Sequence, residues 1–221
     1  NWYSLMDFLP LHFNLQAQRC LIIGGGEIAY RKAELLLLAG AHITVVSPEI
    51  SGKLERLTED GSHQLVKREF QTTDLNDVVL VISATNDNTV NEAVSLEARR
   101  QQIPVNVVDD AKLSSIIFPT IIDRSPVIIS ASTGGTSPVL ARKIRELLES
   151  TIPEGYSNLA RFLGKIRPQL KLRFPATEER RRVTEAFLAS PGQELAIQGK
   201  DDAAMRYIEI DTDQLPTGEV S

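Results

Sequence analysis

A glycine-rich run is the pattern with the clearest chemical meaning in this chain of 221 residues. The run Gly24-Gly25-Gly26-Glu27-Ile28-Ala29 matches G-x-G-x-x-A, a pattern that lets the backbone approach a dinucleotide pyrophosphate. Gly24 allows a tight turn, Gly26 leaves room for phosphate because it has no Cβ, and Ala29 lets a helix lie close to a strand. A simple strand-to-helix turn is the alternative interpretation.

Two further groups of polar residues are candidates for contacts to a nucleotide. Ser47-Pro48-Glu49 follow the second expected strand, at the place where an Asp or Glu normally binds the ribose hydroxyls. No Arg follows at once to bind a 2′-phosphate, so the pattern favours NAD over NADP. Thr85 and Asn86 follow the fourth expected strand. A solvated loop charge at Glu49, and a helix cap at Thr85 and Asn86, are the alternatives.

The adjacent carboxylates Asp109 and Asp110 follow the fifth expected strand. An acid at this edge of a parallel sheet can accept a proton or orient a substrate amine beside the cofactor. A turn cap is the alternative. Short-chain dehydrogenases pair a Tyr with a Lys four residues later, and none of the four tyrosines here has that Lys. The Cys and His ligands of metal-dependent alcohol dehydrogenases are also missing.

Alternating strands and helices must position these groups in the first half of the chain. Apolar runs predict strands at 19–23, 42–46, 64–70, 78–83 and 104–108. Helical patterns lie between them at 27–39, 50–58 and 90–100. This alternation predicts an α/β fold, a Rossmann-like parallel sheet with helices on both faces.

The second half predicts a small α+β segment followed by an all-helical part. We expect strands at 115–119 and 126–130, then a helix that Ser137-Pro138 opens and that runs to about Ser150. Helical, basic sequence continues from 153 to 190 with breaks expected at Pro168 and Pro175, and one more helix is expected from Pro191 to about Ile208. The polar residues 211–221 predict a linker.

Charge and composition exclude several classes of protein. The net charge of −5 argues against a general nucleic-acid binder, but residues 124–182 hold twelve Lys/Arg against five Asp/Glu, which suits a polyanionic ligand. Cys20 is the only cysteine and the three histidines lack metal-ligand spacing, so we expect no protein metal site and a cytoplasmic location. The apolar runs are too short to span a membrane.

Several motifs in the same order resemble the siroheme synthase family. They are the runs Gly24–Lys32, Ala84–Asp87, Asn106–Asp109, Ile121–Pro126 and Ser132–Arg142. The resemblance begins at Met6–Pro10 and points to the N-terminal precorrin-2 dehydrogenase and ferrochelatase module of that family.

This resemblance implies a reaction, its ligands and its partners. NAD would oxidise precorrin-2 to sirohydrochlorin, and Fe²⁺ insertion would then give siroheme. A homodimer is implied, as is a C-terminal methyltransferase domain beginning near Gly218–Val220, into which we expect the full-length protein to continue. The implied domains are a NAD-binding domain at 1–114, a dimerisation segment at 115–150, a helical domain at 151–215 and a linker at 216–221.

The resemblance also assigns roles to single residues. The catalytic aspartate corresponds to Asp109, and the NAD contacts correspond to Gly24–Ile28 and Ser47–Glu49. A substrate with many carboxylates needs cationic partners. Candidates are Arg124, Arg142, Lys143, Arg145 and Arg180–Arg182, together with the amides of Gly134, Gly135 and Thr136.

Two departures from the family pattern and three alternative interpretations accompany this prediction. Ala111 stands where the family often has proline, so the Asp109 loop is expected to be less rigid, whereas Thr133 keeps the hydroxyl of the usual serine. A solvated helix face is the alternative for Arg180–Arg182. For the whole chain, the alternatives are a dimeric NAD-sensing module without chemistry and a dehydrogenase without chelatase activity.

Overall fold

The computed structural model describes residues 7–58 and 63–209. They form two compact units: the first reaches Phe118 and also takes in Gly134–Thr136, while the second holds Pro119–Thr133 and the residues from Ser137 onward. The predicted linker at 216–221, the rest of the polar tail from 211 and the start of the resemblance at Met6 lie outside the described residues.

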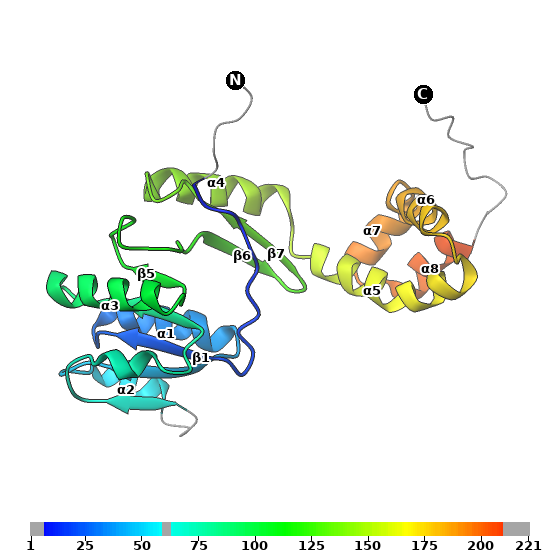
Figure 1. Ribbon diagram of the computed structural model, residues 1–221. Helices are drawn as coiled ribbons and strands as arrows, with labels where there is room; N and C mark the ends of the chain where they lie inside the picture. The colour runs from blue at the N-terminus through cyan, green and yellow to red at the C-terminus, as the bar shows by residue number, and fades with distance from the viewer. Residues whose placement is uncertain (1–6, 59–62, 210–221) are drawn as a thin grey trace. The chain divides into compact units, whose positions relative to one another are not determined.

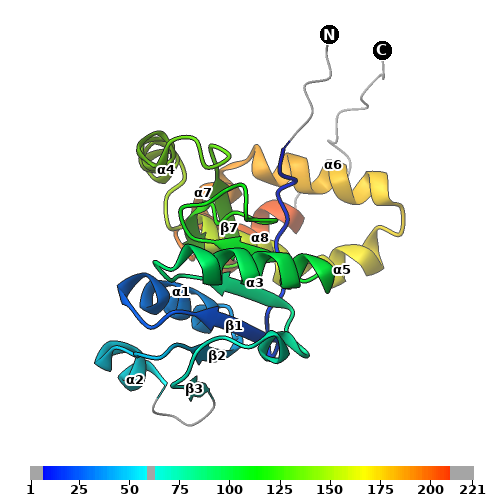
Figure 2. The same cartoon turned by 60° about the vertical axis from the view of Figure 1, so that its left-hand side comes forward.

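The first unit is built on a five-stranded parallel sheet in the order β3-β2-β1-β4-β5. Its strands are β1 (Arg19–Ile23), β2 (His42–Val46), β3 (Gln64–Val66), β4 (Leu80–Ser83) and β5 (Val105–Val107). Between them lie α1 (Glu27–Leu38), α2 (Gly52–Leu57), the 3₁₀ helix η1 (Thr72–Leu75) and α3 (Asn88–Arg100). Figures 1 and 2 show the sheet and its helices. The predicted Rossmann-like fold is confirmed.

Helices cover both faces of this sheet. Along β1, Cys20 and Ile22 pack in one apolar cluster with α1 and α2, whereas Leu21 and Ile23 pack in another with α3 and η1. Successive side chains of a strand point to opposite faces, and all four of these are buried. The continuous apolar run at 20–23 therefore follows from a sheet that is covered on both sides.

The strand predicted at 115–119 is wrong. The outward-facing backbone groups of β5 bind serine side chains there instead of a neighbouring strand. The Ser115 hydroxyl accepts a hydrogen bond from Val105 N at 2.9 Å, and the Ser114 hydroxyl accepts one from Val107 N at 2.9 Å. With these groups satisfied, the segment runs past the sheet edge as a loop.

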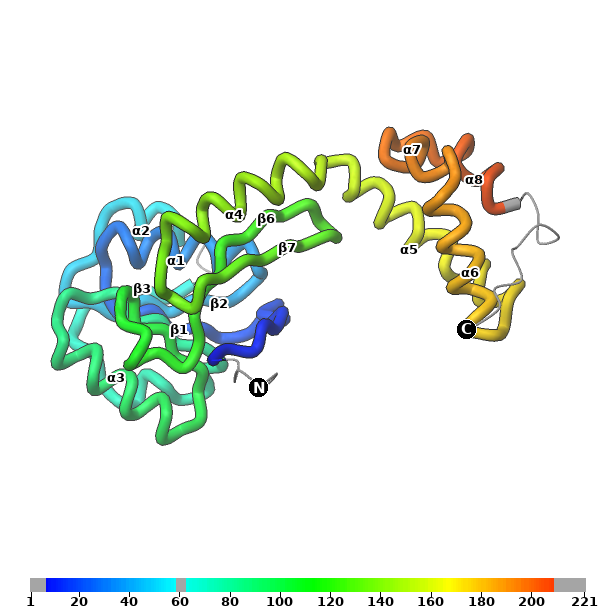
Figure 3. The backbone as a smooth tube through the Cα atoms, turned by 90° about the horizontal axis from the view of Figure 1, so that it is seen from above, coloured from blue at the N-terminus to red at the C-terminus, as the bar shows by residue number. Residues whose placement is uncertain are grey.

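The second unit begins with an antiparallel hairpin and a helix. The hairpin consists of β6 (Thr120–Arg124) and β7 (Val127–Ala131), which pair from Thr120–Ala131 to Arg124–Val127. Helix α4 (Pro138–Thr151) lies alongside the hairpin (Figure 3). The Ser137 hydroxyl caps α4 by accepting from Leu140 N, and Pro138 is at the first turn, as the sequence predicts.

Four more helices follow in the second unit. They are α5 (Tyr156–Arg173), α6 (Thr177–Leu188), α7 (Pro191–Ile197) and α8 (Asp201–Glu209). Phe162 and Phe187 stack at 5.3 Å between ring centroids in their core. The predicted all-helical part is confirmed.

Two helix boundaries in this part differ from the prediction. Pro168 does not break α5, because the exposed Pro168 lies on the outer face while Phe162, Ile166 and Leu170 anchor the inner face in the core. The single helix expected from Pro191 to Ile208 is two helices. Gly199, at φ +73°, ends α7, and Lys200 N then donates to Leu195 O at 2.9 Å, the hydrogen bond of a Schellman cap.

Among the described residues, no helix combines the length and apolar character needed to cross a membrane.

Candidate functional site

In the glycine loop between β1 and α1, one glycine is required by close packing and another leaves open space. Gly24 has φ +113°, and a Cβ on it would collide with the backbone oxygen of Ala84 at the end of β4. Gly26 precedes α1, and no atom of the described residues lies within 4 Å of the place its Cβ would take. The protein's own packing therefore needs glycine at 24, whereas the space over Gly26 is free for a ligand at the helix N-terminus.

The predicted ribose turn lies against this loop. A Cβ on Gly25 would collide with the backbone oxygen of Glu49, and Ser51 N donates to Gly25 O at 2.9 Å. Ser47 is buried, whereas Pro48 and Glu49 are exposed. The structure thus places two cofactor segments that are separate in sequence side by side at the carboxyl edge of the sheet.

Glu27 begins α1, where its negative charge is close to two cations. Lys53 Nζ lies 2.9 Å from one Glu27 carboxylate oxygen, and Arg31 Nε lies 3.6 Å from the other. The hydrogen bond from Lys53 lowers the pKa of Glu27 below its ordinary value. These two cations offset an acidic charge that would otherwise repel phosphate at the helix start.

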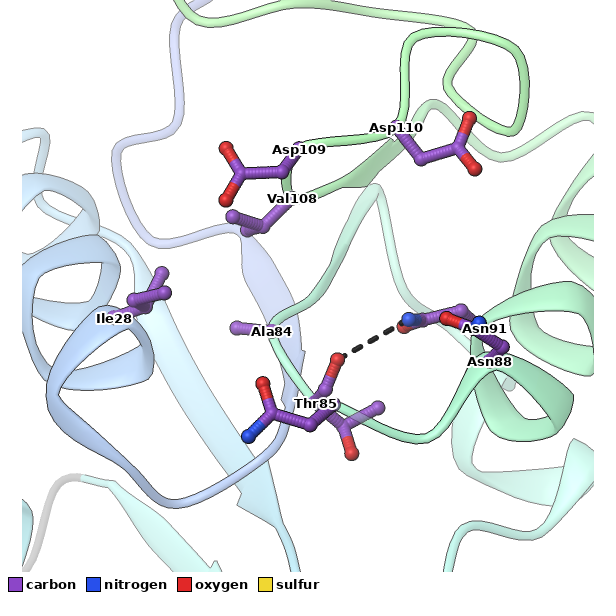
Figure 4. A pocket seen from close by; sticks show the side chains of 9 residues that line it. Ile28, Ala84, Thr85, Asn88, Asn91, Val108, Asp109 and Asp110 are labelled. Atoms are coloured by element: carbon purple, nitrogen blue, oxygen red, sulfur yellow. Dashed lines mark hydrogen bonds between the residues drawn. The ribbon is translucent and has the colours of Figure 1, made fainter.

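A cavity of about 290 Å³ opens beside the glycine loop (Figure 4). Its walls come from the start of α1, the β4–α3 turn, the first turns of α3 and the loop after β5. The lining residues are Ile28, Ala84, Thr85, Asn86, Asn88, Asn91, Val108, Asp109 and Asp110. Three predicted cofactor residues, Ile28, Thr85 and Asn86, therefore share one cavity with Asp109.

Helix capping at the β4–α3 turn is performed by Asp87. Its carboxylate accepts from Thr89 N at 2.9 Å and from Val90 N at 3.2 Å. The Thr85 hydroxyl in turn accepts from Asp87 N at 3.2 Å. Because Asp87 caps α3, the side chain of Asn86 is left to line the cavity.

Asn91 holds this turn in place, a role that was not predicted from the sequence. It is buried, its side-chain amide donates to Thr85 O at 3.1 Å, and its side-chain oxygen accepts from the Ser83 hydroxyl at 2.7 Å. The signal in the sequence is a polar residue on the face of α3 that also carries Val94 and Ala98.

The two carboxylates after β5 differ in their surroundings. Asp110 caps the turn, since its carboxylate accepts from Lys112 N at 2.9 Å and Leu113 N at 3.1 Å. Asp109 is exposed, has φ +61°, and makes neither a hydrogen bond nor an ion pair within 4 Å to another described residue. Figure 4 shows the Asp109 carboxylate pointing to the side of the cavity where Ile28 lies, and the Asp110 carboxylate pointing the other way.

Ser114 braces the loop that carries Asp109, a role that was not predicted from the sequence. The Ser114 hydroxyl accepts a hydrogen bond from Val107 N. Two acceptors lie within reach of its own proton, Asp110 O at 2.7 Å and Val107 O at 3.1 Å. These contacts restrain the loop at the place where Ala111 replaces the expected proline.

The predicted substrate residues fall in both units. Gly134, Gly135 and Thr136 belong to the first unit, and a Cβ on Gly135 would lie 3.7 Å from the Cβ of Ala111, two residues beyond Asp109. Arg124 and Arg142 belong to the second unit. Arg124 is largely buried and lies 3.9 Å from Glu154, whereas Arg142 is exposed.

Most of the other basic candidates have partners on or next to their own helices. Lys143 lies 3.8 Å from Glu146, and Arg145 lies 2.9 Å from Glu149. In the Arg180–Arg182 run, Arg181 pairs with Glu178, and Arg180 donates to Phe174 O at 2.7 Å. These contacts are those expected of a solvated helix face and helix end. Arg182 differs, because it is half-buried and its Nε has no hydrogen-bond partner among the described residues.

Comparison with known families accounts for most of the chain. Residues 11–120 match a family described as putative NAD(P)-binding, residues 129–151 match the sirohaem biosynthesis protein central family, and residues 155–210 match the sirohaem synthase dimerisation region. The chain belongs to the siroheme synthase family. It represents the N-terminal module of that family, as the sequence motifs predict.

Individual relatives agree with this assignment. Siroheme synthase of Nitrosomonas europaea is 46% identical over 97% of this chain, and that of Saccharophagus degradans is also 46% identical over 97%. The match covers 46% and 48% of those proteins, so this siroheme synthase module spans about half their length. A solved structure named SirC, precorrin-2 dehydrogenase, has a TM-score of 0.74 and 27% identity, covering 91% of this chain and 99% of its own.

The family match confirms the predicted class of cofactor, because residues 11–120 include the glycine loop, the ribose turn and Asp109. The match to the dimerisation region falls on α5–α8, within the predicted helical domain.

Replacing Ser114 with alanine is expected to destabilise the first unit. The change leaves the buried Val107 N–H without its partner, which costs about 1–3 kcal/mol in the free energy of unfolding. Urea titration followed by circular dichroism measures the change. Ser150→Ala is the control, because the exposed Ser150 hydroxyl only binds Leu147 O on α4; equal midpoints for the two variants would contradict the bracing role.

Proposed function

We propose that this module is a NAD-dependent precorrin-2 dehydrogenase that converts precorrin-2 to sirohydrochlorin. The observation that carries the proposal is the shared cavity, in which the uncommitted carboxylate of Asp109 lies with Ile28, Thr85 and Asn86. The family match and the likeness to the SirC structure support the same reaction.

The residues around the glycine loop fit a bound dinucleotide. The open space over Gly26, the start of α1 and the pairing of Glu27 with Lys53 and Arg31 suit a pyrophosphate. Pro48 and Glu49 are exposed beside the loop, where they can meet the adenosine ribose. When bound, NAD supplies a hydride acceptor.

Asp109 supplies the proton acceptor for the oxidation. Precorrin-2 loses two hydrogens, one as a hydride and one as a proton. Asp109 takes the proton or holds the pyrrole N–H groups that release it. The left-handed backbone at Asp109 keeps its carboxylate turned away from that of Asp110 (Figure 4).

We further propose that the same module inserts Fe²⁺ into sirohydrochlorin. Two pyrrole protons leave as the ion enters, and Asp109 is the group placed to accept them. The four nitrogens of the macrocycle are the metal ligands, so the reaction needs no protein metal cage. Burial raises the pKa of the Cys20 thiol to about 11, which keeps it out of this chemistry.

Carboxylates of the tetrapyrrole need cationic or amide partners. Arg142 is exposed, and the guanidinium of Arg124 makes two long contacts, at 3.5 Å to Asp123 O and at 3.9 Å to Glu154. The Gly134–Thr136 backbone lies next to Ala111 in the Asp109 loop. We assign these residues to substrate carboxylates, because guanidinium and backbone N–H groups bind them directionally.

We also propose a homodimer. The match to the dimerisation region supports it, and so does an apolar surface on α4, where Val139 is 74% and Leu147 65% exposed. Sedimentation of the full-length protein should give a dimer, and a monomer at micromolar concentration would contradict this assignment.

Asp109→Asn is the central test of the reaction. Asn tolerates φ +61° but cannot accept the proton, so NADH formation from precorrin-2 should fall by about 10²–10⁴-fold while NAD binds as before. Absorbance is followed with precorrin-2 and NAD, and then after adding Fe²⁺.

Asp77→Asn is the matched control, because Asp77 is an exposed aspartate at φ +57° that does not line the cavity. Wild-type turnover by Asp109→Asn would refute the role of Asp109. A wild-type protein that binds NAD but forms no NADH would instead indicate a sensing module. NADH formation with no spectral change on adding Fe²⁺ would indicate a dehydrogenase alone.

Gly26→Val tests the dinucleotide site separately from the chemistry. Its backbone, at φ −87° and ψ −166°, accepts valine, and its surroundings are open, so thermal stability should not change. The branched side chain would occupy the phosphate space and weaken NAD binding by tenfold or more, on the order of 1.4 kcal/mol. Gly164→Val, at another open glycine on α5, is the control, and unchanged NAD affinity in Gly26→Val would contradict the assigned site.

A further inference from the structure

Lys32 is a half-buried cation near the cavity. It is the last residue of the Gly24–Lys32 motif, but neither the prediction from the sequence nor the proposed reaction gives it a role. It lies on α1 one turn after Ile28, which lines the cavity, and next to the buried Ala33. Its ammonium sits 4.1 Å from the ring centroid of Phe118. That distance is within the range of a cation–π interaction, which fixes the position of the charge.

The ammonium lacks the partner that such a position normally requires. Within residues 7–58 and 63–209, no carboxylate oxygen lies within 4 Å of Lys32 Nζ, and no hydrogen bond from it is found. Burial lowers the pKa of Lys32, and the negative charge of Asp109 opposes that shift. A cation that is desolvated in this way is costly to keep, and Asp109 is the charge that compensates it.

The orientation of Asp109 agrees with this pairing. Its carboxylate points to the side of the cavity formed by α1, whereas Asp110 points away and is committed to its own turn (Figure 4). Asp109 makes no hydrogen bond to another described residue. Lys32 belongs to the helix on that side of the cavity, and its charge interacts favourably with that of Asp109.

We propose that Lys32 is a positioning residue for Asp109. Held over Phe118, its ammonium attracts the Asp109 carboxylate to the α1 side of the cavity, where the carboxylate meets the substrate proton. Lys32 itself does not touch the reacting atoms in this arrangement. The catalytic consequence rests on the proposed function of Asp109, whereas the coupling of the two charges does not.

The kinetic test uses Lys32→Met, Lys32→Arg, Asp109→Asn and the double variant in the full-length protein. Methionine keeps the apolar stem against Phe118 but removes the charge, so kcat for precorrin-2 oxidation should fall by about tenfold or more as the carboxylate loses its orientation. The KM for precorrin-2 and the Kd for NAD should stay within about twofold, and Lys32→Arg should restore most of kcat. Adding Lys32→Met to Asp109→Asn should cause no further loss, because the two residues act together.

Each opposite outcome counts against the proposal. A wild-type kcat in Lys32→Met would show that Lys32 does not position Asp109. Equal losses of kcat in Lys32→Met and Lys32→Arg would indicate that Lys32 acts only by packing on Phe118. A raised KM with unchanged kcat would make Lys32 a substrate-binding residue. Independent, additive losses in the double variant would separate it from Asp109.

A second measurement needs no turnover and tests the charge coupling alone. Lysines are ¹³C-dimethylated and titrated by NMR in the wild-type protein, with the Lys32 signal assigned by its loss in Lys32→Arg. Because the Asp109 charge raises the pKa of Lys32, Asp109→Asn should lower that pKa and Asp77→Asn should leave it unchanged. An unchanged Lys32 pKa in Asp109→Asn would overturn the proposal even if the reaction is as proposed. If Asp109→Asn lowers the Lys32 pKa but the wild-type protein forms no NADH, the charge coupling is present and the proposed function is wrong.

Discussion

The close approach of the glycine loop to the end of β4 is the constraint on which the site depends. At Gly24 the backbone passes so near the Ala84 carbonyl that no side chain fits. This contact joins the ends of β1 and β4 and sets the start of α1 beside the β4–α3 turn. The parallel order β1-β4-β5 then brings the loop after β5 to the same edge, so residues from three separate stretches of sequence form one cavity.

Most of the sheet could be predicted because strands that are buried on both faces appear in the sequence as continuous apolar runs. The strands at 19–23 and 42–46 have the predicted limits, since their apolar runs end where burial ends. The edge strand β3 is shorter than predicted, ending at Val66, because Arg68 turns to bind Asp74 at 2.5 Å. The error at 115–119 has a related cause: an apolar run shows that a segment is buried, but not that its backbone pairs with a strand.

Site residues could be predicted from the sequence where the backbone conformation requires a particular residue type. Residues that act by holding their neighbours in place were harder to predict. Glycine at 24 and 26 follows from the turn and the open space. The family resemblance already selected Asp109, and the hydrogen bonds in the structure add that Asp110 is the carboxylate that caps the turn. Asn91, Ser114 and Lys32 act by holding other groups, and such contacts across the fold leave no local pattern in the sequence.

The serine-lined edge of β5 has a consequence for how copies of this chain can meet. An exposed edge strand is a template on which another chain can add a strand. Here the outward N–H groups of Val105 and Val107 already donate to hydroxyl oxygens, and the Val105 carbonyl already accepts from Ser115 N and Ile116 N. A visiting strand would have to displace these bonds one by one, so the nucleotide-binding sheet is closed to edge-to-edge extension on the side that carries Asp109.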